Sequence, residues 1–502
     1  MDKQYGLKHK RWCWLLMPVF VLLYVLLGIC GIVPIRRHIG DPHVNLTFTP
    51  LSFQDTGYYF YSSPTPIISP DGLRVYIVTD KYWMRDGKSF PANEILRYQR
   101  ATGKLTDTGL PMANIEGRFD RFGKQNHDAI FSANGRYVVY ASSNPQHVTV
   151  ERYGSLTHIY RKDLETKTVE DLTRTINGAP PNGPSDHPAI SGDGKVVAFL
   201  FSAKNSSNSF FDKPDQTSPP WEGFYLRDLN TGQTEFVEVP GARRVPLECA
   251  EPISGLRLSE DGSIVVFSSE VSIVTKHKDS IGCTSWLEPM VYDRKTKKLF
   301  HIGITKGDHR YGTEPHVSAD GRFVVFRFVD FREEGESSTC YLYDMQHHSI
   351  EQVGDRSVVG NPAISDDGRF IVFVSRTPNK AMAGTQAKGL TTIAAPTDIY
   401  LFDRKTRKTV CLCKENATLC HKFGWKYYDN LTPSISADGR YVCYAAHLAE
   451  KPSDQTTDSH LHATWVIMVY DRTTGITSAP ITVTGRKTKI RKIPTLEIIQ
   501  GK

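Results

Sequence analysis

The chain has 502 residues, of which 39% are hydrophobic and 23% are charged, and its formal net charge is +7. This composition is typical of a folded protein and excludes wholesale disorder. Residues 1–40 hold six basic side chains against Asp2 alone, a net charge of +5, so only about +2 remains for the rest of the chain. This weak charge argues against a nucleic-acid-binding domain, which would present a basic stripe.

The N-terminal region contains an apolar segment long enough to cross a bilayer. Residues 12–33 carry no formal charge and are rich in Leu, Val, Ile and Phe, and about 20 such residues span a membrane as a helix. The segment lacks the small-residue cleavage site of a signal peptide, although a cleaved signal remains the alternative. We predict a signal-anchor helix over 12–34 after a cytoplasmic tail at 1–11, because Lys8, Lys10 and Arg11 precede it.

This orientation places the rest of the chain outside the cytosol, in a lumen, at the cell surface or in a periplasm. Residues 35–57 form a predicted stem, which becomes strand-like at LTFTPLSF. Part of this stem is expected to pair with the last repeat of the following domain.

A ten-residue pattern recurs seven times between residues 58 and 485. Each copy has a serine, one variable residue, Asp-Gly or Asn-Gly, and then a β-branched and aromatic run, as in ISADGRYVCY at 435–444. Such a dipeptide between apolar runs predicts a hairpin with a type I′ turn, in which both central residues have positive φ. The serines of the seven copies are Ser69, Ser132, Ser191, Ser259, Ser318, Ser365 and Ser436.

A second strand–turn–strand pattern alternates with the first, as in IYLFDRKTRK at 399–408. One hairpin of each kind makes a four-stranded unit of roughly 50 to 70 residues. A single unit buries too few side chains, at about 1.5 to 3 kcal/mol each, to offset an ordering cost of at least about 1 kcal/mol per residue. The units must therefore cover one another's faces.

A closed ring satisfies this requirement and leaves no bare sheet edge between units. We predict an all-β fold, a seven-bladed β-propeller of four-stranded antiparallel blades over 58–485, preceded by one transmembrane helix. An open solenoid is the alternative, and it would need polar end caps. The tail at 486–502 begins with the basic run RKTKIRK and is expected to face solvent or lipid.

The SxDGRxVVF and IYxxDRxTG elements resemble the TolB-like, WD-type repeat of β-propellers, over about residues 64–484. The resemblance implies the propeller fold. It says little about chemistry, because similar propellers include secreted binding scaffolds, domains attached to peptidases and some carbohydrate-active enzymes.

Long insertions are expected to gather on one face of the ring, opposite the Asp-Gly turns, and loops on a rigid scaffold commonly carry binding. They lie at 203–222, 271–288, 377–397 and 447–464. Polar residues just before each first strand should converge at the channel mouth on the same face. The predicted ligand-binding residues are His127, Asp128, His187, Glu251, Glu314, His316, Asn361 and Thr432.

These polar residues have two other interpretations. They are also what a wet channel would contain without any ligand. Neutral imidazoles from His127, His187 and His316, with Glu251 or Glu314, would suit a divalent metal, and some seven-bladed pectate-type lyases resemble this arrangement. No cofactor is predicted.

Nine cysteines are present, seven of them after the apolar segment. In an oxidising compartment we expect Cys249 and Cys283 to form a disulfide, and the odd number leaves at least one thiol unpaired within the chain. The stretch CLCKENATLC at 411–420 is interpreted as a disulfide or buried segment in preference to a metal site. Possible glycosylation sequons occur at Asn45, Asn205, Asn416 and Asn430.

No GxSxG, HExxH, GxxxxGK or GxGxxG motif occurs in the sequence. Only 18 residues follow Thr484, so the hydrolase domain of the propeller-bearing peptidases is not expected. The leading hypothesis is a membrane-anchored, non-catalytic propeller that binds a protein or glycan through its loop face. The alternative is a carbohydrate-active enzyme at the channel mouth, and a third possibility is a purely structural role with a filled channel.

Overall fold

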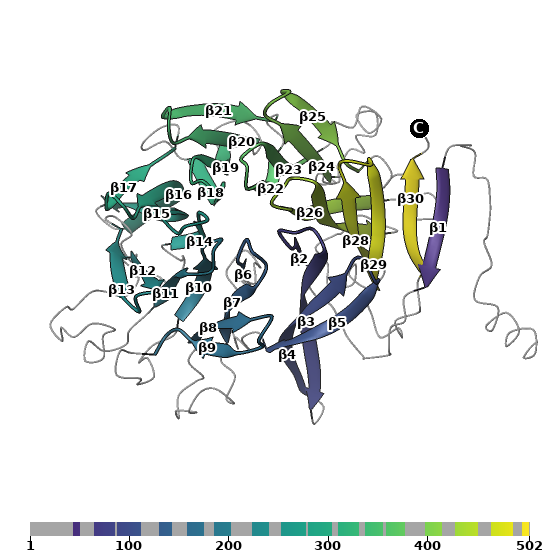
Figure 1. The fold of residues 1–502 in the computed structure, drawn as a ribbon. Coiled ribbons are helices and arrows are strands. Elements are labelled where there is room, and N and C mark those ends of the chain that lie inside the picture. The colour runs from purple at the N-terminus through teal and green to yellow at the C-terminus, as the bar shows by residue number, and fades with distance from the viewer. Residues whose placement is uncertain are drawn as a thin grey trace, which may run out of the picture.

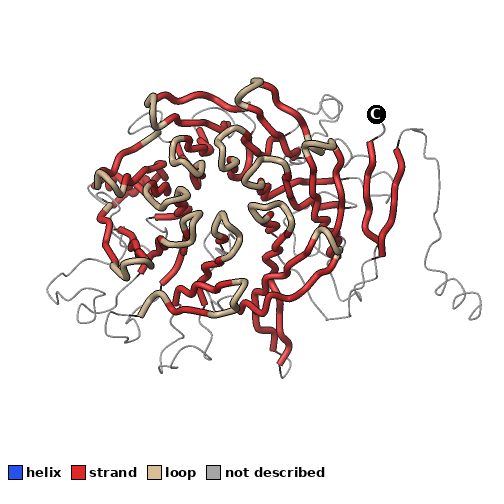
Figure 2. The backbone as a smooth tube through the Cα atoms, viewed as in Figure 1, coloured by secondary structure: helices blue, strands red, loops and turns tan. Residues whose placement is uncertain are grey.

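The computed structural model shows seven four-stranded antiparallel sheets arranged around a central axis (Figures 1 and 2). The prediction of an all-β, seven-bladed propeller is therefore confirmed. The structure describes residues 44–50, 65–85, 88–111, 130–142, 158–174, 185–201, 223–239, 253–277, 280–303, 310–330, 337–354, 358–376, 397–413, 427–449, 463–484 and 494–500.

Each blade consists of four consecutive strands. Blade 1 contains β2 (Thr65–Ile68), β3 (Arg74–Arg85), β4 (Lys88–Gln99) and β5 (Lys104–Pro111). Blade 2 contains β6 (Ile130–Phe131), β7 (Tyr137–Ser142), β8 (His158–Asp163) and β9 (Val169–Asp171). Blade 3 contains β10 (Ser185–Ile190), β11 (Val196–Phe201), β12 (Gly223–Asp228) and β13 (Thr234–Glu238). Blade 4 contains β14 (Ile253–Leu258), β15 (Ile264–His277), β16 (Ser280–Asp293) and β17 (Lys298–His301).

The remaining three blades follow the same plan. Blade 5 contains β18 (Arg310–Val317), β19 (Phe323–Asp330), β20 (Ser337–Asp344) and β21 (Ser349–Val353). Blade 6 contains β22 (Val358–Ile364), β23 (Phe370–Arg376), β24 (Thr397–Asp403) and β25 (Lys408–Cys411). Blade 7 contains β26 (Tyr427–Ile435), β27 (Tyr441–Ala449), β28 (Ala463–Asp471) and β29 (Ile476–Thr484).

The sheet of blade 7 is extended outward by two further strands. β30 (Pro494–Gln500) pairs with β29, and β1 (Val44–Pro50) pairs with β30 in an antiparallel register that sets Val44 opposite Gln500. β1 lies in the predicted stem and β30 in the predicted basic tail. Neither strand enters blade 1, so the ring closes between two blades that are each continuous in sequence (Figure 1).

The Ser-x-Asp-Gly motif forms the connection between the first and second strands, as predicted, but the turn is not type I′. Only the glycine has positive φ, +66° at Gly439, and its amide donates to the carbonyl of Ser436 at 2.9 Å. The Ser436 hydroxyl donates to Asp438 Oδ1 at 2.7 Å and accepts the Tyr441 amide at 2.9 Å. The side chains of the motif, and not a mirror-image turn, therefore hold the hairpin together.

The arginine that follows Asp-Gly in several copies of the motif forms an ion pair within its blade. Arg440 Nε and Nη2 donate to the two carboxylate oxygens of Asp471 at 3.1 and 2.8 Å, which joins the second strand to the third. Equivalent pairs in other blades are Arg136–Asp163, Arg322–Asp344 and Arg369–Asp403. The hydrogen bonds from Arg136 lower the pKa of Asp163 to about 2, against the opposing effect of burial.

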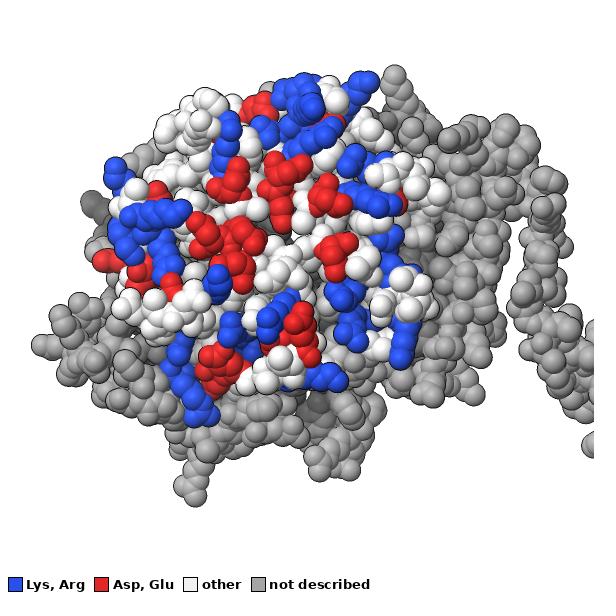
Figure 3. Space-filling view, viewed as in Figure 1, with Lys and Arg blue, Asp and Glu red and all other residues white. Residues whose placement is uncertain are grey.

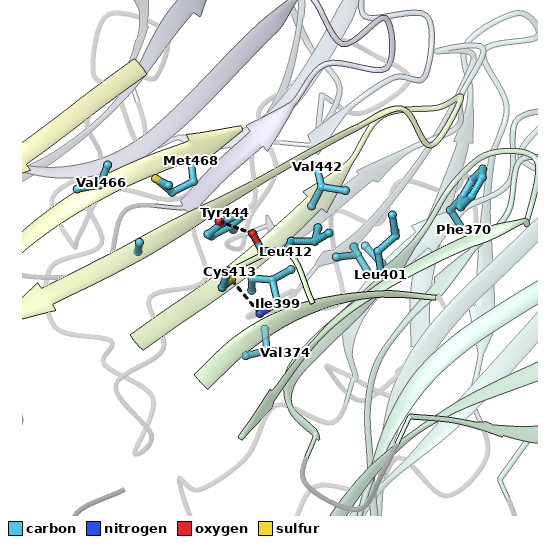
Figure 4. Packing of buried hydrophobic residues seen from close by; sticks show 13 residues of the cluster. Phe370, Val374, Ile399, Leu401, Leu412, Cys413, Val442, Tyr444, Val466 and Met468 are labelled. Atoms are coloured by element: carbon cyan, nitrogen blue, oxygen red, sulfur yellow. Dashed lines mark hydrogen bonds between the residues drawn. The ribbon is translucent and has the colours of Figure 1, made fainter. Parts of the chain in front are cut away.

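The hydrophobic core lies between the blades. Figure 4 shows the cluster between blades 6 and 7, where Phe370 and Val374 of blade 6 face the layer that holds Val442 and Tyr444 of blade 7. These side chains are at most 2% exposed. Each blade thus has apolar residues on both faces, and the doubly apolar Val-Val-Phe runs are explained by burial on both sides.

The structure describes the predicted insertions only in part and does not describe the predicted membrane anchor. The predicted insertion at 271–288 is not a loop, because β15 and β16 continue as a long hairpin from Ile264 to Asp293 in which Val271 pairs with Trp286. The insertions at 203–222, 377–397 and 447–464 lie mainly outside the described residues. None of the described residues belongs to a helix long and apolar enough to span a bilayer, and the predicted anchor at 12–34 lies outside them.

Candidate functional site

The inner strands of blades 3 to 7 share an irregularity on the side away from the Asp-Gly turns. In each of these strands the register against the second strand shifts, and the shift marks a β-bulge. The shifts lie between Asp186 and Ala189, Ser254 and Arg257, Thr313 and His316, Val359 and Ala363, and Leu431 and Ser434. Five of the eight predicted ligand-binding residues lie at or beside these bulges.

Two of these positions have a backbone conformation that is unusual for their residue types. His187 has φ of +51° and Thr432 has φ of +50°, whereas the equivalent positions in blades 4 and 6 are glycines, Gly255 and Gly360. Positive φ is costly for a β-branched residue such as threonine. Strained residues of this kind persist where the surrounding fold imposes them, often at functional sites.

His187 is almost fully buried, with 3% of its surface exposed. Its backbone amide donates to Asp186 Oδ1 at 2.8 Å, and its Nδ1 lies 3.8 Å from Asp186 Oδ2. The adjacent carboxylate therefore fixes the bulge through the backbone of the histidine. The polar pair lies within β10, the innermost strand of blade 3, whereas His187 was predicted to precede this strand.

His316 follows the bulge of β18 and lies near Arg257 of the neighbouring blade. Burial first, and then the positive charge of Arg257, lower the pKa of His316 to about 3. Its imidazole is therefore neutral at physiological pH. A neutral imidazole offers one hydrogen-bond donor and one acceptor to a ligand, and no charge.

Of the other six predicted site residues, three are described by the structure and three are not. Asn361 is half-buried in β22 and Thr432 is exposed in β26, while Glu314 lies in β18 at a bulge. His127, Asp128 and Glu251 lie outside the described residues, so the predicted set of three histidines stays a prediction. In the portion of the chain that the structure describes, no three His, Cys, Asp or Glu side chains are grouped so as to hold a metal ion.

The predicted modification sites are described only in part. Cys249, Asn205 and Asn416 lie outside the described residues, and so the Cys249–Cys283 disulfide is untested; Cys283 belongs to β16. Asn45 belongs to β1 and Asn430 to β26. Among described cysteines, Cys340, Cys413 and Cys443 are free thiols.

The opposite face of the ring carries a charge pattern that the sequence reasoning missed. In Figure 3, acidic side chains gather around the centre of this face and basic side chains lie farther out. Burial raises the pKa of Glu260, and the negative charges of Asp366, Asp193 and Asp261 raise it further. Glu260 and Asp366 occupy the same place in the sequence repeat, the variable position of Ser-x-Asp-Gly.

No protein-family model and no curated protein sequence matches the chain. The chain is similar in shape to solved β-propellers. The β-propeller domain of the Trilobed protease from Pyrococcus furiosus aligns with a TM-score of 0.49 at 14% identity, over 86% of this chain and 98% of that one. An oligogalacturonate lyase from Vibrio parahaemolyticus aligns with a TM-score of 0.44 at 14% identity, over 80% and 94%.

TolB from Acinetobacter baumannii aligns with a TM-score of 0.33 at 15% identity, over 85% of this chain and 81% of that one. These proteins differ in what they do, and the likeness is too distant to indicate a function for this chain. The inner strands and their polar residues are therefore the features of this chain that bear on its function.

Proposed function

We propose that this chain is a membrane-anchored, extracytoplasmic propeller that binds a protein or glycan partner, without catalysis, at the loop-side mouth of its channel. The observation that supports the proposal is the recurrence of the inner-strand bulge in blades 3 to 7. Bulges redirect side chains and are frequent beside binding sites. On this proposal, the bulges of five neighbouring inner strands would direct polar residues toward the channel mouth.

The chemistry of the mouth suits a neutral or hydroxyl-rich group of the partner. His316 is uncharged above about pH 4, because its pKa is about 3, and Asn361 and Thr432 add further uncharged donors and acceptors. Binding that depends on these side chains should not change between pH 5 and 8 through His316. Partner binding that changes with pH around an ordinary histidine pKa would contradict this role.

The test uses the full-length protein in detergent and an unbiased crosslinking screen for partners. Thr432→Gly keeps a residue that tolerates φ of +50° and deletes the side chain at the mouth, and His316→Ala deletes the imidazole. We expect both variants to lose the crosslinked partner, whereas Ser349→Ala, at an exposed position on the outer strand β21, retains it. Retention of every partner by both mouth variants would refute the proposed site.

The anchor and the enzyme alternative need separate measurements. Protease protection of the propeller in sealed vesicles would support its extracytoplasmic orientation, and digestion from the cytosolic side would overturn it. Metal analysis of the purified protein distinguishes the carbohydrate-active alternative: a bound divalent ion whose removal abolishes partner binding or glycan cleavage would replace the non-catalytic proposal.

A further inference from the structure

The seven turns after the inner strands lie next to one another around the axis, and we call this arrangement the turn ring (Figure 2). At six junctions a backbone amide of one turn donates to a carbonyl of the next. The bonds are Asn134 to Gly192 (3.2 Å), Asp193 to Glu260 (2.9 Å), Glu260 to Ala319 (2.9 Å), Ala319 to Asp366 (3.0 Å), Asp366 to Ala437 (3.0 Å) and Ala437 to Pro70 (3.1 Å).

The turn ring is interrupted at the seventh junction, between blades 1 and 2. Pro70 accepts the bond from Ala437 of blade 7 through its carbonyl. Proline has no amide hydrogen, so Pro70 cannot donate as Glu260, Ala319, Asp366 and Ala437 do from the same position. Asn134 and Asp193 donate from the next residue of the motif, and their counterpart Asp71 makes no such bond among the described residues. In the described part of the chain, no backbone hydrogen bond of this kind therefore joins the turns of blades 1 and 2.

The same junction lacks the side-chain contact that supports the turn glycines elsewhere. At the other six junctions, a Cβ added to the glycine would come closer than 3.0 Å to a side chain of the preceding blade: Tyr441, Tyr137, Val196, Ile264, Phe323 or Phe370. At Gly135 of blade 2 it would meet only Pro70, at 3.9 Å. Blade 1 has Arg74 where the other blades have these bulky side chains.

The described part of the buried cluster between blades 1 and 2 contains Tyr76, Val138, Tyr140 and Tyr160. Tyr76 stacks on Phe131 with ring centroids 4.0 Å apart. Three of these four side chains are tyrosines, so the described contacts of this seam include polar hydroxyl groups.

The seam between blades 1 and 7, where the two ends of the ring meet, is held more firmly. Its cluster contains nine buried residues. The Ile68 amide donates to Ser434 Oγ at 2.8 Å, and the Arg100 guanidinium lies 3.8 Å above the centre of the Tyr441 ring. This seam therefore has a turn-ring hydrogen bond, a further hydrogen bond from a backbone amide to a side chain, and a cation–π contact.

We propose that the propeller opens laterally between blades 1 and 2, and not between its first and last blades, and that this opening connects the central channel to the side of the ring. The missing turn bond and the uncovered Gly135 both weaken the same seam. Separation there breaks none of the six hydrogen bonds of the turn ring, and it breaks the bond of 3.2 Å from Lys162 Nζ of blade 2 to the Thr108 carbonyl of blade 1. Opening at any other seam breaks at least one of the six turn-ring bonds.

The rates at which buried thiols react report which seam opens, because a thiol must become exposed to be alkylated. Val138→Cys places a thiol in the 1–2 seam at a fully buried position. Native Cys443 in the 1–7 seam and Cys340 in the 5–6 seam are equally buried and serve as internal controls. In the full-length protein without denaturant, with labelling sites resolved by mass spectrometry, we expect position 138 to react at least about tenfold faster than both controls.

Two reciprocal variants test the role of the proline. Pro70→Ala supplies the missing amide and should slow labelling at position 138 but not at Cys443. Ala437→Pro removes the donor between blades 7 and 1, at a turn position where blade 1 already accommodates proline, and should speed labelling of Cys443. Labelling of Cys443 as fast as position 138 would overturn the proposal, as would an unchanged rate at position 138 in Pro70→Ala.

A measurement on the unsubstituted protein guards against misfolding of Val138→Cys. Nitration of buried tyrosines should modify Tyr76, Tyr140 and Tyr160 before Tyr444, which is fully buried between blades 6 and 7. Simultaneous modification of all four tyrosines would indicate global unfolding and would contradict a selective opening.

Discussion

Replacing Ser436 with alanine should destabilise the whole propeller by about 2.5 to 4 kcal/mol. The hydroxyl is fully buried, donates to Asp438 Oδ1 at 2.7 Å and accepts the Tyr441 amide at 2.9 Å. Its loss leaves that amide without an acceptor, at a cost of about 1 to 3 kcal/mol, and removes a hydrogen bond to a carboxylate, which contributes about 1.5 to 3 kcal/mol when the group is charged. The lower part of the combined range applies because Asp438 is accessible to water.

Urea unfolding followed by tryptophan fluorescence measures this loss as a shift in the midpoint at constant slope. The matched control is Ser349→Ala, which deletes the same hydroxyl from an exposed position and should change stability by no more than about 0.5 kcal/mol. If Ser436→Ala also stays within about 0.5 kcal/mol of the unsubstituted protein, the serine does not hold the turn. The explanation of the seven-fold motif would then be wrong.

The remaining predictions concern ionisation, turn geometry and the core. Because the folded-state pKa of Asp163 lies below its unfolded value, the pair with Arg136 stabilises the fold above about pH 4, and this contribution is lost as the pH falls through about 2. Asp163→Asn should therefore cost about 1 kcal/mol or less at pH 7 in chemical denaturation, and nothing near pH 2; an equal cost at both values would contradict it. Gly439→Ala should lower stability clearly more than Gly103→Ala in thermal unfolding. Both glycines have positive φ, which costs an alanine about 1 to 2 kcal/mol, but only Gly439 lies against an aromatic ring. Equal losses of stability would show that this packing is irrelevant. Phe267→Ala removes a fully buried ring between blades 3 and 4 and should cost about 3 to 5 kcal/mol; a loss below about 1 kcal/mol in the same assay would mean that this seam does not support the ring.

The backbone geometry of the candidate site was not predictable from the sequence. His187 and Thr432 were predicted to precede the first strands, and the structure includes them in β10 and β26. Their bulges and positive φ values could not be predicted, because a register shift depends on how the first strand meets the second. The acidic centre of the other face was missed because Glu260 and Asp366 come from separate repeats, and only the closed ring brings them together.

The sequence by itself determined the strands, the hairpins and the number of blades, because these depend on short-range turn chemistry and on apolar runs within one repeat. Only the tertiary structure decided how the copies differ. β1 and β30 pair although they lie at opposite ends of the chain, and the Arg–Asp pairs join the two repeated elements. The turn ring is interrupted after Pro70, and this matters only because the closed fold places the turns of blades 1 and 2 next to each other. Such contacts form between residues that are distant in sequence, so no local pattern contains them.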